Sequence, residues 1–73
     1  MEYELLLPEE KIKIINERIL DLERHIFHNE TLLLENESIG LFDEESVVSM
    51  NTQNSRYTQQ ILVLGQIRDS INQ

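Results

Sequence analysis

The stretch "ENESIGLFDEES", residues 35–46, contains a helix stop that is followed at once by a helix start. Gly40 can adopt the left-handed conformation that ends many helices, so "NESIG" predicts a helix C-terminus. Asp43 is a favoured N-cap residue, and Glu44 and Glu45 would then lie at the positive end of the next helix dipole. The stretch therefore predicts two helices joined by a tight loop.

Pro8 marks the beginning of the first helix, because proline fits the first helical turn, where the N–H that it lacks would have no partner. Between Pro8 and Gly40 no other proline or glycine interrupts the chain, and afterwards only Gly65 does so. The structure of the residues before Pro8 is not predicted. The predicted segments are an arm at residues 1–7 and a hairpin at 8–73, which consists of a helix at 8–38, a loop at 39–43 and a helix at 44–71.

Both predicted helices carry residues that recur at alternating steps of three and four, the spacing of a left-handed coiled-coil seam. The two seams can be paired from the loop outward, from Asn36 opposite Val47 to Ile12 opposite Ile71, with no position left over. The sequence therefore predicts an all-α fold, an antiparallel two-helix coiled-coil hairpin. The predicted seam consists of Ile12, Ile15, Ile19, Leu22, Ile26, Asn29, Leu33 and Asn36 in the first helix and of Val47, Met50, Asn54, Tyr57, Ile61, Leu64, Arg68 and Ile71 in the second.

Two layers of the predicted seam contain polar residues away from the loop. Asn29 faces Asn54, and a buried amide pair at one layer costs stability but fixes the register, because a slipped Asn loses its partner. The alternative is that both amides tilt out to solvent. Arg68 occupies another layer, and we expect its guanidinium to reach outward to an acid such as Glu9 or Asp69.

A second row of apolar residues follows the seam by one place in each helix. These residues are spaced by multiples of seven, and in an antiparallel hairpin the two rows fall on one side of the molecule. A glycine on the same side would let another helix approach closely. Because a hairpin buries only one seam, an exposed apolar row predicts an interaction site. This association face consists of Leu20, Phe27, Leu34, Val48, Leu62 and Gly65.

The sequence leaves the occupant of the association face open. A second copy of the chain would complete a homodimeric four-helix bundle, which is the leading prediction. A different protein could dock there instead, and scattered surface apolarity is the third reading. With 73 residues and no cysteine, the chain belongs to a size class that usually adds disulfides, a metal or a partner subunit for stability.

The net charge of −8 is unevenly distributed. Residues 25–55 contain Glu and Asp but neither Lys nor Arg. We expect neither nucleic acid nor a membrane as a partner, since binding to phosphates needs Lys and Arg. The charge suits a basic or apolar patch on another protein. It also permits mimicry of the charge of a nucleic acid at a basic site.

The predicted loop is a second candidate contact, because its carboxylates lie beside apolar residues. A protruding Phe42 among acids would suit a basic, partly apolar patch on another protein. Alternatively, the acids cap the second helix and keep the protein soluble. This loop tip consists of Glu37, Leu41, Phe42, Asp43, Glu44 and Glu45.

Asp21, His25 and His28 share one helical face and could supply three ligands to zinc. They lack a fourth ligand and shielded surroundings, so we interpret them as solvated polar residues. Two packed helices offer no concave pocket that would perturb carboxylate pKa values for acid–base catalysis. The sequence also contains no cysteine and no Gly-rich phosphate loop. We therefore predict a protein without enzymatic activity, cofactor or metal.

The stretch "PEEKIKIINERILDLERHIF" at residues 8–27, followed by a Leu-rich turn and by "ENES", resembles small helical-hairpin proteins of tailed phages, especially those that infect marine cyanobacteria. The resemblance covers residues 8–38, and it transfers no functional residue. It implies a viral accessory protein or a virion component. We predict a protein-interaction or assembly factor that is cytoplasmic or part of a virus particle. The alternative is an acidic inhibitor that occupies a basic site on a host protein.

Overall fold

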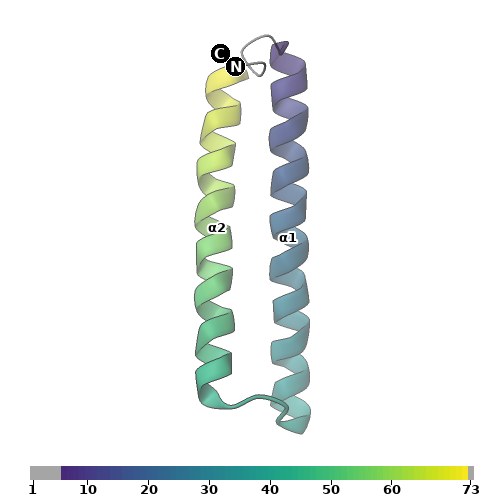
Figure 1. Ribbon diagram of the computed structural model, residues 1–73, viewed down its shortest axis with the longest axis vertical. Coiled ribbons are helices and arrows are strands. Elements are labelled where there is room, and N and C mark those ends of the chain that lie inside the picture. Colours follow the sequence, from purple (N-terminus) through teal and green to yellow (C-terminus); the bar gives the residue numbers. More distant parts are fainter. Residues whose placement is uncertain (1–5, 73) are drawn as a thin grey trace.

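The computed structural model describes residues 6–72, and within this range the chain forms two α-helices and no strand. Helix α1 spans Pro8–Ile39 and helix α2 spans Glu44–Asn72. The helices run antiparallel and side by side, with the loop at one end of the molecule (Figure 1). We call the opposite end the open end. This confirms the predicted all-helical hairpin, while most of the arm predicted at 1–7 lies outside the described residues.

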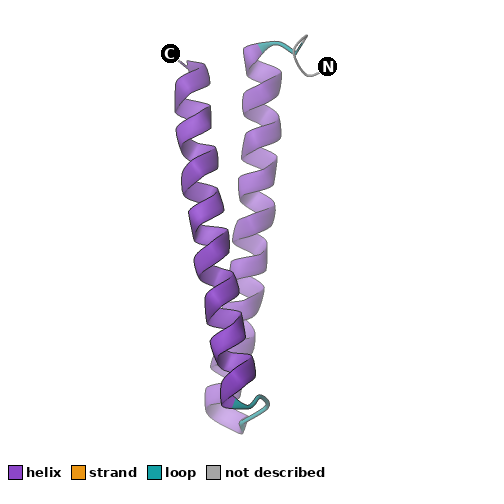
Figure 2. Cartoon of the chain, turned by 60° about the vertical axis from the view of Figure 1, so that its left-hand side comes forward, coloured by secondary structure: helices purple, strands orange, loops and turns teal. Residues whose placement is uncertain are grey.

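The molecule is a rod with extents of 50 × 22 × 14 Å. Its two helices are slightly inclined to each other, and no other described residue forms a third layer over either side (Figure 2). Each helix therefore contacts the other along one stripe only. The rest of its circumference faces outward.

The ends of α1 follow from its first and last residues. Leu7 precedes the helix in an extended conformation, and its carbonyl accepts hydrogen bonds from the N–H groups of Glu10 and Lys11 at 3.0 and 3.1 Å. Gly40 adopts the left-handed conformation (φ 63°, ψ 48°), and its N–H donates to the carbonyl of Asn36 at 2.7 Å. The C-cap predicted at Gly40 is confirmed, and the helix extends one residue beyond the prediction.

Side chains close the loop on both sides. The Asp43 carboxylate accepts a hydrogen bond from the N–H of Ser46 at 2.8 Å, which makes Asp43 the N-cap of α2, as predicted. The side-chain oxygen of Asn36 accepts a hydrogen bond from the N–H of Phe42. Asn36 was predicted to face Val47 in the seam. Its amide oxygen also pairs with the loop backbone, and the N–H of Phe42 thereby gains a partner beside the packed helices.

The contact between the helices is shallow. Ile15 is the only buried residue in the described part of the chain, with 9% of its surface exposed. All other positions predicted for the seam are half-buried in both helices. The residues predicted for the seam therefore lie at the contact between α1 and α2. Two helices alone do not remove these residues from water.

Candidate protein-interaction face

The association face is exposed along both helices. The exposed fraction is 48% for Leu20, 71% for Phe27 and 64% for Leu34 on α1. It is 63% for Val48 and 56% for Leu62 on α2. Fully burying an aliphatic or aromatic side chain of this size contributes about 1.5–3 kcal/mol, and the hairpin itself leaves most of this contribution unused.

A groove runs between the helices on the side of the association face. Its floor contains Ile26 and Leu33 from the seam, and its rim contains the carboxylate residue Glu30 of α1. The open space in it is about 450 Å³. We call it the interhelical groove; its lining comprises Ile26, Glu30 and Leu33 of α1 and Asn51, Asn54, Ser55, Thr58 and Gln59 of α2.

Gly65 lies in the interior of α2, and the packing of the hairpin gives no steric reason for a glycine there. A Cβ atom added there would meet only Nη2 of Arg68, at 3.9 Å, which is an ordinary van der Waals distance. A helix-interior glycine costs about 1 kcal/mol relative to alanine. The described part of the chain therefore contains nothing that requires glycine at this position.

Arg68 crosses between the helices at the open end. Its Nη1 donates a hydrogen bond to Oδ1 of Asn16 at 2.8 Å. The predicted acidic partner, Glu9 or Asp69, is therefore wrong, although the guanidinium does reach out of the seam. Asn16 lies on α1 beside the seam, where its amide oxygen is within hydrogen-bond reach of the Arg68 guanidinium.

Asn29 and Asn54 meet across the two helices. Nδ2 of Asn29 donates to Oδ1 of Asn54 at 2.9 Å in a half-buried position. The same Nδ2 lies 3.4 Å from Oε1 of Gln53, which is exposed. Of the two readings that the sequence left open, the paired one matches this geometry. The role of the pair in fixing the register stays a prediction.

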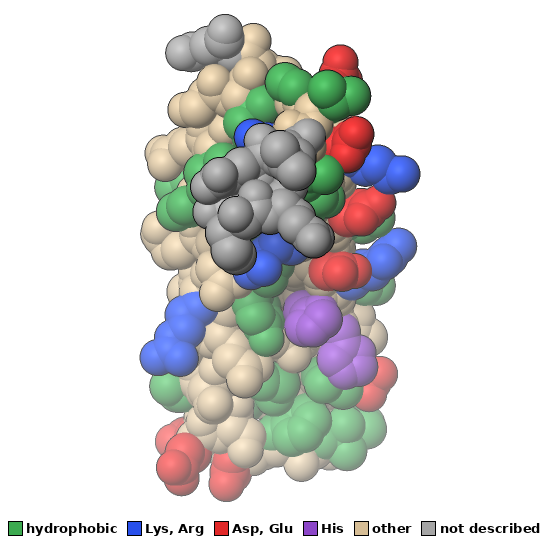
Figure 3. Space-filling view, turned by 45° about the horizontal axis from the view of Figure 1, so that its top comes forward, with side chains coloured by type: hydrophobic (Ala, Val, Ile, Leu, Met, Phe, Trp, Pro, Cys, Tyr) green, Lys and Arg blue, Asp and Glu red, His purple; other side chains and the backbone are tan. Residues whose placement is uncertain are grey.

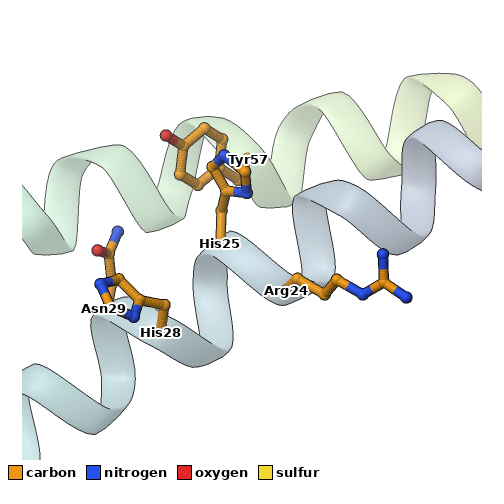
Figure 4. A pocket seen from close by; sticks show the side chains of 5 residues that line it. All are labelled: Arg24, His25, His28, Asn29 and Tyr57. Atoms are coloured by element: carbon orange, nitrogen blue, oxygen red, sulfur yellow. The ribbon is translucent and has the colours of Figure 1, made fainter.

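The opposite side of the hairpin carries the two histidines, which lie next to each other below a mixture of acidic and basic side chains (Figure 3). His25 points toward Tyr57 of α2, with ring centroids 5.6 Å apart and an interplanar angle of 82°, an edge-to-face contact (Figure 4). Together with Arg24, His28 and Asn29, these rings line an open hollow of about 190 Å³. The spacing of the seam does not predict this contact, because His25 lies one place outside the seam.

The atoms around these histidines make local hydrogen bonds. Nδ1 of His25 lies 2.9 Å from the carbonyl oxygen of Asp21, which can only accept, so Nδ1 carries the proton. The carboxylate of Asp21 pairs with Arg24 at 3.4 Å. No group of three or more His, Asp or Glu side chains between residues 6 and 72 is arranged to hold a metal ion.

The loop tip is less open than predicted. Leu41 is 51% exposed, but Phe42, whose N–H is bound by Asn36, is half-buried and does not protrude as predicted. The hydrogen bond from the Ser46 N–H lowers the pKa of Asp43 below its ordinary value of 3.8. Glu37, Glu44 and Glu45 are exposed. Asp43 therefore has a structural role as a cap, while the glutamates remain free for contacts.

No known protein family, no curated protein and no solved structure matches this chain. The resemblance of residues 8–38 to phage hairpin proteins therefore stays a prediction. Neither helix in the described range has a stretch that is long and apolar enough to span a membrane.

Proposed function

We propose that this chain is a non-enzymatic protein-interaction or assembly factor that works through the association face. The observation that carries the proposal is an imbalance in burial. The two helices bury only Ile15 among the described residues, whereas Phe27 and Leu34 on the association face remain 71% and 64% exposed. Apolar residues that recur every seven positions outside the seam are typical of a helix that packs against further helices.

The total surface supports the same conclusion. The chain exposes 5895 Å², whereas a compact monomer of this mass exposes roughly 4,700 Å². The excess of about 1,200 Å² is larger than the roughly 800 Å² that each partner buries in a standard interface. The rod therefore has surface to spare for a specific contact along its length.

A second copy of the chain would supply two helices and form the four-helix bundle that the sequence predicts. A different protein would supply its own helix or helices to the same face. The resemblance to phage proteins adds the expectation that the assembly belongs to a virus, either in the particle or as an accessory complex. In each case the contact surface on this chain is the same.

Site-specific photo-crosslinking in cells that naturally produce the protein tests this proposal. The photoreactive residue p-benzoylphenylalanine replaces Phe27 on the association face or, as a control, Val63 on the opposite side, which is 50% exposed. We expect covalent protein adducts from position 27 and several-fold fewer from position 63. The mass of the adduct distinguishes a second copy from another protein. Equal yields at both positions, or no adduct at position 27, would contradict the proposal.

A further inference from the structure

We infer that the interhelical groove and the association face bind one basic amphipathic helix of another protein. This inference rests on the proposed function and specifies its partner. Such a helix would lie along the groove and complete a three-helix bundle. Its apolar residues would contact the association face, and its Lys and Arg residues would meet the carboxylates on the rim of the groove.

The charge of the groove is the first reason. Glu30 lines it, and Glu23 and Glu37 lie one heptad before and after Glu30 on the same side of α1. Within residues 6–72 the only ion pair joins Arg24 to Asp21, so these three glutamates have no cationic partner. The facing residues of α2 are Asn51, Ser55 and Thr58, which are uncharged.

The cations on this side of the hairpin other than Arg24 lie at the open end. Lys13 lies there beside Asn16 and Leu20. Arg68 also lies there and is bound to Asn16. Between Leu20 and the loop, Arg24 lies beside Glu23 and Phe27, but its guanidinium is paired with Asp21 and not with the glutamates of the groove. A ligand that covers the groove must therefore bring the positive charge itself.

The same charges make a second copy a poor occupant. Two chains that pack through this side would bring Glu23 and Glu30 of both copies into one interface, and like charges placed together in a desolvated interface are strongly unfavourable. The uncharged face of α2 offers no compensating cation. A basic helix removes this repulsion and converts the same carboxylates into ion pairs.

The shape of the face gives the second reason. Ile26 and Leu33 form an apolar floor, and Leu20, Phe27 and Leu34 form a row beside it. The row from Leu20 to Leu34 is about 21 Å long at 1.5 Å per residue, which fits a partner helix of about four turns. Gly65, which the hairpin does not need, lies on α2 further toward the open end than the groove residues and beside the Arg68 guanidinium, and its missing side chain would let the end of such a helix come close to α2.

Two synthetic peptides of equal length provide the probes. Both carry Leu at heptad positions and a single Trp; the remaining positions are Lys in the basic peptide and Glu in the acidic peptide. The chain contains no Trp, so fluorescence of the peptide reports binding directly. We expect the basic peptide to bind one chain with a Kd in the micromolar range that rises with salt, and the acidic peptide to show no binding.

Variants of matched charge locate the contact. Glu23→Gln/Glu30→Gln should weaken binding of the basic peptide about tenfold, whereas Glu44→Gln/Glu45→Gln, which removes the same charge from the loop tip, should leave the Kd within twofold. Gly65→Ala should weaken binding several-fold while raising the melting temperature of the free hairpin. A residue with only a structural role would not produce these opposite changes.

The outcomes separate the two proposals. Equal binding of both peptides, or equal loss of affinity in the two double variants, would show nonspecific attraction and overturn the inference. The inference would also be overturned if the chain sediments as a dimer and this dimer does not bind the basic peptide. In that case the proposed function would still stand, provided that the position-27 adduct is the homodimer. Absence of any position-27 adduct contradicts the proposed function itself, whatever the peptides do.

Discussion

Replacement of Asn54 by alanine is expected to destabilise the hairpin through loss of its contact with Asn29. The amide pair has good geometry, with 2.9 Å between Nδ2 of Asn29 and Oδ1 of Asn54, and it lies in a half-buried layer of the seam. A neutral intramolecular hydrogen bond contributes about 0.5–1.5 kcal/mol net. The orphaned Asn29 amide can still reach water and the Gln53 side chain at 3.4 Å. We therefore expect the lower half of that range, about 0.5–1 kcal/mol.

The double variant Asn29→Leu/Asn54→Leu should change stability in the opposite direction. Each half-buried leucine contributes about 1 kcal/mol, half of the value for full burial, and the lost hydrogen bond removes about 1 kcal/mol. The net gain is about 1 kcal/mol, or roughly 4–8 °C in melting temperature for a domain of this size. The register should become less specific, because leucine packs equally well against neighbouring layers.

A double-mutant cycle measures the pair directly. Urea unfolding is followed by circular dichroism for the wild type, Asn29→Ala, Asn54→Ala and the double alanine variant, at several protein concentrations so that self-association is detected. We expect a coupling free energy of about 0.5–1 kcal/mol. A coupling below about 0.3 kcal/mol, or a leucine double variant that is less stable than the wild type, would refute the assigned role of the pair.

Three further substitutions test the helix ends and the groove. Gly65→Ala should stabilise the hairpin by up to about 1 kcal/mol in urea unfolding, and a loss of stability would show an unrecognised contact at this position. Asp43→Ala should lower the melting temperature at neutral pH. The folded pKa of Asp43 is lowered, so the stability that its carboxylate contributes is present above pH 3.8 and is lost as the pH falls through the folded pKa. The melting temperatures of wild type and variant should therefore become equal in acid. Asn36→Ala should cost about 1 kcal/mol and speed amide exchange at Phe42, and unchanged exchange there would contradict the loop contact.

The sequence was sufficient to predict the hairpin because its helix-capping residues and its apolar periodicity are independent signals. Gly40 and Asp43 mark the loop by backbone conformation and capping, and both act as predicted. The seam follows from side-chain spacing, and its centre falls in the same loop. The half-buried Asn29–Asn54 pair could be located because periodicity fixes which residues face each other across antiparallel helices.

Periodicity does not determine what long or loop-adjacent side chains contact. Asn36 occupies a seam position, but its amide oxygen accepts a hydrogen bond from the N–H of Phe42 in the loop, which the spacing of the seam does not predict. Arg68 has enough rotatable bonds to reach an amide on the other helix, and Asn16 lies closer than the expected acids. The edge-to-face contact of His25 involves a position beside the seam, where spacing predicts exposure.

The hairpin pairs its buried polar groups better than it buries its apolar residues. Within residues 6–72, the amide and guanidinium side chains placed in the seam find hydrogen-bond partners in the chain: Asn29 with Asn54, Asn36 with the loop and Arg68 beyond the seam. No buried side-chain polar atom in this range lacks a partner. The apolar residues outside the seam remain mostly in water. Buried polar groups in the described residues are thus paired within one chain, whereas the apolar packing is incomplete, so the proposed partner would supply hydrophobic contact in addition to its ion pairs with exposed carboxylates.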